Sequence, residues 1–453
     1  MAVDLLSNSL LTYPMRGSQA TTDEREIAIA MVALPTEIIF QQLTRAFAKS
    51  QDFSRHEVRR RQIALLERLV RHADAQVPFY RDSKRLKPLF RADGGFEFAG
   101  WSDVPILTRN EARENEEALQ ARAVPADMGA LEIRSTSGST GTPLKFKQTS
   151  FQFVASEVLV NRMLLWRGLW PIQRIAASTY DAAASSPAPG MLKVPAGLDF
   201  DKQIELLRQN QTTHVVASPS IAAAWANAAA PQDLPDLIAV ITTGGVLRPE
   251  IRTKIEQKLK VKVINLYSAS ELGPIASEGP DGRLRINEET LLLEGPSGPH
   301  IPKAPTRVVV TPFYAFGTPL IRYAPGDYVR FSNANVRDAL GLRRLDDVVG
   351  RGRNLLRQPD GNLFLPNQLR AKGLEAILDH REWQLVQTSL TDIMLRIGVP
   401  RPPSPQQWEA LQEYVKNSLP NHKTSVVVVD RIENNISSGK AHEMFLSLIG
   451  ENG

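Results

Sequence analysis

The chain has 453 residues, of which 42% are hydrophobic and 23% charged, so it can fill a hydrophobic core and is not disordered as a whole. Its 54 basic and 49 acidic residues leave a net charge of +5 that is scattered along the chain, which gives no basic stripe for a nucleic acid. The absence of cysteine excludes disulfides, thiolate nucleophiles, thiolate zinc sites and iron–sulfur clusters, so the chemistry has to use oxygen and nitrogen groups.

The amino-terminal segment has no features of a targeting sequence. It carries an acid at Asp4, lacks a basic start and has no sustained apolar core. No stretch of the chain approaches the roughly 18–20 apolar residues of a membrane helix. We therefore expect a cytoplasmic protein without a membrane span, built from two to three domains at roughly 100–200 residues each.

Residues 22–75 are predicted to form a helical preface. Apolar side chains recur there at spacings of three and four with charges between them, as at Leu65, Leu66 and Leu69. We expect Pro78 to stop the helix, because proline cannot donate a backbone hydrogen bond. The aromatic residues that follow it are then free to dock onto the body of the protein.

A loop rich in hydroxyl and glycine residues lies between two predicted strands, at residues 135–143. Its glycines permit tight curvature, and its hydroxyls and free N–H groups can surround phosphate oxygens. It is not a Walker loop, because no lysine follows the second glycine. The pattern predicts a phosphate-binding loop, with a flexible linker as the alternative. The candidate residues are Thr136, Ser137, Gly138, Ser139, Thr140 and Gly141.

From residue 130 onward, short apolar strands alternate with helical patterns, which is typical of a parallel sheet flanked by helices. The predicted strands cover residues 174–178, 214–217, 237–242 and 261–266. The predicted helices cover residues 202–210, 220–229 and 249–258.

A polar cluster directly follows the apolar strand at 261–266. A carboxylate such as Glu271, at the carboxyl end of a parallel strand, lies where α/β proteins bind ligands. Glu271 could hold a magnesium ion between nucleotide phosphates, and Tyr267 could offer a flat face to a base or an aromatic substrate. The alternative is that Glu271 only caps the next segment.

Past about residue 280 the pattern changes to strands and turns, which predicts a second, largely antiparallel layer. Asp327 lies in a tight turn there and could accept both hydroxyls of a ribose, while Arg351 could contact phosphate or ribose oxygens. An aspartate that only forms the turn is the alternative. The predicted strands cover residues 291–293, 306–310, 320–323 and 328–331.

The last hundred residues predict a small α+β unit after a boundary near 350. Lys440 lies in a turn at 437–440 and, taken alone, would be an ordinary surface lysine. The predicted elements are a hairpin turn at 360–361, helices at 366–378 and 405–418, and strands at 384–388 and 424–429.

The order of these motifs resembles the adenylate-forming superfamily of acyl-CoA synthetases, luciferases and peptide-synthetase adenylation domains. The motifs are the loop at 136, the glycine pair at 244–245, the cluster at 267–271, Asp327, the Gly-Arg at 350 and the Gly-Lys at 439. The segments 77–81, 105–109 and 111–115 resemble the phenylacetate-CoA ligase branch, and the resemblance covers roughly residues 60–442.

The resemblance implies an α/β fold with a large and a small domain. A large N-terminal domain, residues 1–349, would contain parallel and mixed sheets with flanking helices and would bind ATP and the carboxylate. Residues 350–353 would be a hinge, and residues 354–453 a small, mobile α+β C-terminal lid that carries Lys440.

The resemblance also implies roles in nucleotide binding. The loop at 136–141 would clamp the β- and γ-phosphates of ATP, Gly244 and Gly245 would lie beside the adenine, and Tyr267 would stack on it. Ser270 and Glu271 would support Mg²⁺. Asp327 would hold the ribose, and Arg351 would contact nucleotide oxygens.

The catalytic residue implied by the resemblance is Lys440, whose ammonium would bridge the substrate carboxylate and the α-phosphate and so screen their repulsion. Glu271 would share in catalysis through the metal. We expect the walls of the acid pocket at Tyr180, Ser218, Pro219 and Val246.

The implied reaction converts a carboxylic acid and ATP into an acyl-adenylate and pyrophosphate, after which a thiol displaces AMP. Coenzyme A is the expected second substrate, which makes the protein an aryl- or acyl-CoA ligase. Arg353 stands where the family has an aspartate in the hinge, so a carrier protein or an amine is the alternative acceptor. A catalytically inactive binding subunit on the same fold is a further alternative, and a homodimer is left open.

Overall fold

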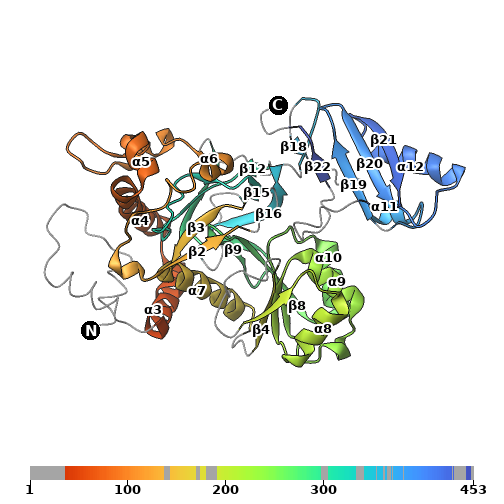
Figure 1. The fold of residues 1–453 in the computed structure, drawn as a ribbon, viewed down its shortest axis with the longest axis horizontal. Coiled ribbons are helices and arrows are strands. Elements are labelled where there is room, and N and C mark those ends of the chain that lie inside the picture. Colours follow the sequence, from red (N-terminus) through yellow and green to blue (C-terminus); the bar gives the residue numbers. More distant parts are fainter. Residues whose placement is uncertain are drawn as a thin grey trace. The chain divides into compact units, whose positions relative to one another are not determined.

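The chain forms two compact units in the computed structural model, Met1–Val348 and Val349–Gly453 (Figure 1). The structure describes residues 36–136, 143–169, 174–179, 191–296, 305–332, 341–352, 355–360, 363–364, 369, 371–380, 382–430, 432 and 445–449. None of the helices in these ranges is both long enough and apolar enough to cross a bilayer.

The helical preface consists of α3 (Thr36–Lys49), α4 (Arg55–Gln76) and α5 (Pro78–Ser83), and its predicted start at 22–35 lies outside the described residues. Ser54 and Glu57 form a capping box at the start of α4, because each side chain accepts a hydrogen bond from the other's backbone N–H. The predicted stop at Pro78 is confirmed, since α4 ends at Gln76 and Pro78 opens a new helix. Tyr80 is fully buried, and its hydroxyl donates to the Pro319 carbonyl at 2.9 Å.

The largest sheet of the first unit has the strand order β12-β15-β16-β10-β9-β8-β7-β6-β4-β5. The neighbours from β5 to β8 pair in parallel, as the alternation of strands and helices predicts. The strands are β4 (Ile175–Thr179), β5 (Leu192–Pro195), β6 (His214–Ala217), β7 (Ala239–Thr242), β8 (Lys262–Ala269), β9 (Gly273–Glu278), β10 (Leu284–Ile286), β12 (Thr306–Arg307), β15 (Asp327–Phe331) and β16 (Arg344–Arg351).

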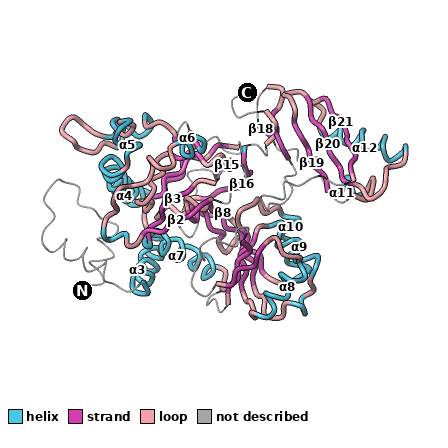
Figure 2. Tube along the Cα trace, in the orientation of Figure 1, coloured by secondary structure: helices cyan, strands magenta, loops and turns pink. Residues whose placement is uncertain are grey.

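Helices cover both faces of the parallel half of this sheet. One face packs against α8 (Phe200–Gln209), α9 (Pro219–Ala228) and α10 (Pro249–Leu259) around the buried Trp225 (Figure 2). The other face packs Val216 and Ile241 against α7 (Ser150–Trp166). This two-sided cover explains why the strands are apolar throughout.

A four-stranded sheet and a two-stranded ribbon complete the first unit. The sheet has the order β1-β14-β13-β11, with strands β1 (Leu107–Thr108), β11 (Leu291–Glu294), β13 (Val309–Pro312) and β14 (Tyr323–Ala324). The short helix α6 (Arg109–Glu114) follows β1 directly. The ribbon pairs β2 (Leu131–Ser135) with β3 (Lys145–Thr149). The predicted strand pair around the loop at 135–143 is therefore confirmed.

Two predicted strands of the antiparallel layer need correction. The predicted strand 306–310 divides at Val308 into β12 and β13, which belong to different sheets. The predicted strand 320–323 forms only from Tyr323 onward. Arg322 has a positive φ of 50°, and this left-handed conformation cannot continue an extended strand.

The second unit is a four-stranded sheet of order β21-β20-β19-β22 with a helix against it. The predicted helix at 405–418 is α12 (Pro405–Ser418), whose Leu411 and Val415 are buried. The predicted helix at 366–378 is wrong in extent, since α11 covers only Ala371–Glu375. The strands are β19 (Glu382–Gln387), β20 (Asp392–Gly398), β21 (Lys423–Val429) and β22 (Phe445–Ser447), with the small pair β17 (Leu356–Arg357) and β18 (Leu363–Phe364).

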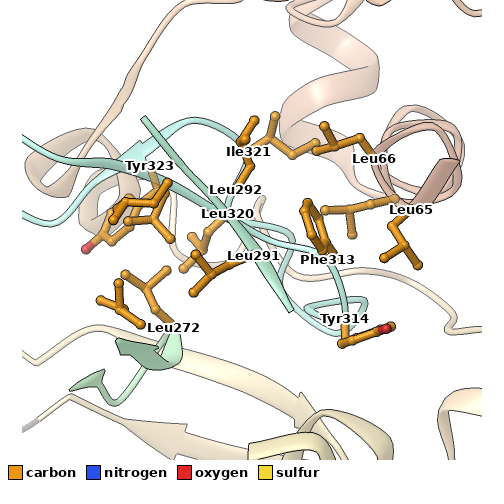
Figure 3. Packing of buried hydrophobic residues seen from close by; sticks show 14 of the residues in the cluster. Leu65, Leu66, Leu272, Leu291, Leu292, Phe313, Tyr314, Leu320, Ile321 and Tyr323 are labelled. Carbon is orange, nitrogen blue, oxygen red and sulfur yellow. The ribbon is translucent and has the colours of Figure 1, made fainter. Parts of the chain in front are cut away.

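The main apolar cluster of the first unit joins the preface to the antiparallel layer. Figure 3 shows it running from Leu65 and Leu66 of α4, past Phe313, to Tyr323 and Leu272. Leu272 directly follows Glu271, so the core reaches the predicted site. The predicted α/β fold class, with parallel and mixed sheets and a small α+β C-terminal part, is confirmed.

Candidate functional site

Three of the predicted segments meet at the carboxyl edge of the parallel strands. The register pairs Ala217 of β6 with Thr242 of β7, and Thr242 with Asn265 of β8. The segments that follow these strands therefore leave the sheet side by side. The Oγ1 of Thr243 and the Oγ of Ser268, 2.7 Å apart, join two of them by a hydrogen bond.

The glycine pair packs directly against the start of α9. Gly244 has a φ of +73°, a conformation that favours glycine. A Cβ on Gly245 would lie 3.1 Å from Cδ of Pro219, so this close approach depends on the missing side chain. Ser218 caps α9 by accepting from the N–H of Ile221 at 3.3 Å. The predicted pocket residues Ser218 and Pro219 thus lie beside the glycine pair.

Tyr267 and Asp327 are hydrogen-bonded although 60 positions separate them. The Tyr267 hydroxyl donates to Oδ2 of Asp327 at 3.0 Å. Asp327 opens β15 after the turn at Gly326, which has a φ of +90°. Tyr267 is only 8% exposed. Its ring is therefore packed against the protein and is less open for stacking than an exposed ring would be.

Glu271 and Tyr323 form a second buried pair. The Tyr323 hydroxyl donates to Oε1 of Glu271 at 3.1 Å, and both side chains are buried. Burial raises the pKa of the Tyr323 phenol well above its ordinary value, and the neighbouring Glu271 carboxylate raises it further. The phenol therefore stays protonated and acts as a donor to the carboxylate. The interpretation of Glu271 as a mere helix cap does not fit this geometry.

Two arginines that the sequence did not single out as site residues, Arg322 and Arg109, are bonded to or act on the segment around Tyr323. Arg322 is 4% exposed, and its Nη1 donates to the carbonyls of Ser102 at 2.8 Å and Val104 at 2.6 Å. It thereby fixes the segment before Tyr323. Arg109 follows β1, whose register pairs Thr108 with Ala324, and its positive charge acts on the Tyr323 phenol. The position of Arg109 depends on a pairing between segments more than 200 residues apart, which no local pattern reveals.

Two hydrogen bonds join the described residues on either side of the predicted phosphate-binding loop. The N–H of Thr136 donates to the Leu144 carbonyl at 2.9 Å, and the Leu144 N–H donates to Oγ1 of Thr136 at 2.9 Å. The loop residues Ser137, Gly138, Ser139, Thr140 and Gly141 lie outside the described residues.

The remaining predicted residues are exposed, belong to the second unit or fall outside the described part of the chain. Ser270 is exposed beside Glu271, and Val246 is 36% exposed after the glycine pair. Arg351 ends β16 and belongs to the second unit. Tyr180 and Lys440, like the hinge position Arg353, lie outside the described residues.

The described residues can bind a magnesium ion for which a nucleotide supplies most of the ligands. Oε1 of Glu271 accepts from Tyr323, and no described residue bonds to Oε2. No cluster of three or more His, Cys, Asp or Glu side chains is found within the ranges the structure covers. Mg²⁺ usually binds through one or two carboxylates, substrate phosphates and water, so a single Glu271 is consistent with it.

No protein-family model matches the chain. Protein CapK of Staphylococcus aureus is 28% identical over 163 residues, which is 36% of this chain and 36% of that protein, so the match spans about a third of either length.

Solved structures cover far more of the chain. A 2-hydroxyisobutyryl-CoA ligase in the postadenylation state, in complex with R3-HIB-AMP, has a TM-score of 0.65 and 17% identity over 86% of this chain and 89% of its own. The same ligase with 2-HIB-AMP and CoA, in the thioesterification state, has a TM-score of 0.55 and 16% identity over 88% and 91%. The chain therefore has the fold of adenylate-forming acyl-CoA ligases.

Proposed function

We propose that the protein activates a carboxylic acid with ATP, forming an acyl-adenylate and pyrophosphate, and then transfers the acyl group to the thiol of coenzyme A. The observation that carries this proposal is the pair of hydrogen bonds Tyr267–Asp327 and Tyr323–Glu271 at one edge of this fold. They join the cluster 267–271 to Asp327 and to Tyr323, and the sequence resemblance assigns the cluster and Asp327 to nucleotide and metal binding.

The nucleotide half of the proposed site follows from this geometry. Each carboxylate oxygen of Asp327 can accept more than one hydrogen bond, so ribose hydroxyls can donate to it alongside Tyr267. The exposed loop at Gly244 and Gly245 allows an adenine to approach the backbone closely. Glu271 would hold Mg²⁺ against the phosphates, and the metal, when bound, would neutralise phosphate charge.

The chemical step brings two anions together, the substrate carboxylate and the α-phosphate. Lys440 would screen this repulsion with its ammonium, and the loop at 136–141 would hold the departing phosphates. The chain has no cysteine, so the thiol of the second step has to arrive with the substrate. A rotation of the C-terminal unit at 350–353 would separate the two steps.

We also propose the branch of ligases and the acceptor of the acyl group. Short matches at 77–81 and 105–115 favour the phenylacetate-CoA ligase branch. Arg353 in the hinge keeps a carrier protein or an amine as the second candidate acceptor. Offering CoA, a carrier protein and amines in parallel separates these acceptors, because each gives a product of different mass.

The test of the first half-reaction is carboxylate-dependent exchange of labelled pyrophosphate into ATP. We expect exchange with at least one acid of a panel and its loss in Lys440→Ala. The Lys440→Ala variant should still convert a pre-made acyl-adenylate with CoA, because the lysine serves only the first step. Lys416→Ala, a lysine in the last turn of α12, is the matched control. Full exchange in Lys440→Ala would remove the role assigned to this lysine, and absence of exchange with every acid would remove the proposed function.

A further inference from the structure

A row of hydroxyl side chains crosses the carboxyl edge of the parallel sheet. The register pairs Ala177 of β4 with Val216 of β6, and Ala217 of β6 with Thr242 of β7. Continuing this register puts Thr179, Ser218 and Thr243 in one line, about 4.8 Å from strand to strand. Residues in register share a face of the sheet, so the three hydroxyls belong to the same side.

The β4 end of this row has buried hydroxyls that no described protein group satisfies. Oγ1 of Thr179 and Oγ of Ser178 are inaccessible to solvent and have no hydrogen-bond partner among the described residues. Adjacent residues of a strand point to opposite faces, so of these two only Thr179 lies on the face of the row. Buried polar atoms in folded proteins almost always have a partner, so the unpartnered Thr179 hydroxyl at this edge needs an explanation. A bound molecule with its own hydroxyls would supply the missing donors and acceptors.

The hydroxyls at the other end of the row already have protein partners. Ser218 bonds the Ser220 hydroxyl at 2.9 Å and caps α9, while Thr243 bonds Ser268 at 2.7 Å. Each hydroxyl can donate one hydrogen bond and accept two. A ligand lying along the row could therefore bond to Thr243 and Ser268 without breaking their mutual bond.

A half-buried acid on α7, Glu157, faces the same edge. Val160 and Leu164 pack with Val216 and Ile241, and Glu157 lies on the same helical face one turn earlier. Ser156 approaches to 2.9 Å of where a Cβ of Gly273 would lie, which sets this turn at the carboxyl ends of the strands.

No described residue makes a hydrogen bond or ion pair to the Glu157 carboxyl, and its nearest charged influence is Arg134. Burial raises the pKa of this carboxyl. A protonated or ionised carboxyl accepts hydrogen bonds from ligand hydroxyls in either state.

We propose that the acid bound by this protein carries hydroxyl groups on its carbon chain, which the hydroxyls of Thr179, Ser218 and Thr243 and the carboxyl of Glu157 recognise. This inference rests on the proposed acid-activating function and names its substrate class. A plain aryl or alkyl acid would leave the Thr179 hydroxyl buried and unpaired, which disfavours its binding.

The experiment compares pyrophosphate exchange with acids matched in carbon number: lactate and glycerate against propionate, gluconate against hexanoate, and phenylacetate as the aryl reference. We expect a hydroxylated acid to exceed its unsubstituted match by at least tenfold in kcat/KM. Thr179→Val and Thr243→Val keep the side-chain shape without the hydroxyl, and each should lower kcat/KM for the hydroxylated acid about tenfold with KM for ATP unchanged. The control Thr424→Val removes a hydroxyl from β21 of the other unit.

The outcomes separate the two proposals. Two outcomes overturn the hydroxyl inference and leave acid activation standing. One is pyrophosphate exchange that is fastest with the unsubstituted or aryl acids. The other is an equal loss of kcat/KM for both acid types in Thr179→Val. Glu157→Gln keeps the acceptor oxygen and should retain the preference, whereas Glu157→Leu should weaken it. Absence of exchange with all acids overturns both proposals together.

Discussion

Two buried glutamates of the first unit, Glu289 and Glu271, are held in opposite ways. Oε1 of Glu289 lies 2.5 Å from Nη1 of Arg162, and the Ser50 hydroxyl donates to the same oxygen at 2.7 Å. Glu271 is bonded instead by the neutral Tyr323 hydroxyl, and it makes no ion pair with any residue in the described ranges. A protein cation pairs with the first carboxylate, whereas the described partner of the second is a neutral hydroxyl.

The difference separates a structural carboxylate from the one that we propose to bind the metal. Arg162 also donates to Asn287 at 3.0 Å and to the Phe47 carbonyl at 3.3 Å, so its network ties α3 and α7 to the turn before β11. Tyr323 packs in the core near Leu272 and presents only its hydroxyl to Glu271 (Figure 3). A buried carboxylate without a cation is costly, and this cost supports the metal-binding role that we propose for Glu271.

The largest expected effect is on stability at the structural pair. Glu289→Ala should lower the free energy of unfolding by about 3–5 kcal/mol, because it leaves Arg162 buried without a counter-charge. The double variant Arg162→Met/Glu289→Leu should recover most of this loss, since it removes both charges. Urea denaturation measures the free energy of unfolding of both variants. If Glu289→Ala loses less than about 1 kcal/mol, the pair contributes no more than an ordinary surface ion pair.

The next effect is on catalysis at the functional carboxylate. Glu271→Gln keeps an acceptor for Tyr323 but removes the charge, so pyrophosphate exchange should fall about 100- to 1000-fold while the melting temperature stays unchanged. Glu250→Gln, on the exposed face of α10, is the matched control. A loss of stability without a loss of exchange per folded molecule would make Glu271 structural like Glu289.

A smaller effect is expected at the second tyrosine–carboxylate pair. Tyr267→Phe removes the hydrogen bond to Asp327 and should raise KM for ATP about tenfold with little change in kcat, because the carboxylate loses its orientation. Tyr314→Phe removes another buried hydroxyl from the same core and serves as the control (Figure 3). Equal KM values in the two variants would contradict a positioning role for Tyr267.

The smallest effect is a pH dependence of stability. The raised pKa of the Tyr323 phenol means that the unfolded chain releases this proton first, near the ordinary phenol pKa of 10.0. The stabilisation is therefore complete below pH 10 and is lost as the pH rises above it. Tyr323→Phe should make the alkaline loss of unfolding free energy shallower, as urea titrations between pH 8 and about 11 would show. An unchanged slope would mean that Tyr323 does not carry this linkage.

Local patterns predicted the parallel half of the large sheet well. The strands β6 and β7 and the helices α9, α10 and α12 lie within a few residues of their predicted ranges. The strands are apolar runs, and each of the three helices has a proline in its first turn, so the signals act within a few residues. The splitting of 306–310 at Val308 was not predictable in this way, because its two halves bind different sheets.

Residue type and local period are enough to predict the order of the motifs and the α/β class, and to exclude chemistry on a cysteine of the protein. Which distant side chains lie in contact depends on the tertiary structure. It paired Tyr267 with Asp327 and Glu271 with Tyr323, brought Arg109 beside β14, and left the Thr179 hydroxyl buried without a partner among the described residues. Hydrogen bonds and burial at such sites depend on how distant strands are registered, and a chain's local pattern does not encode that register.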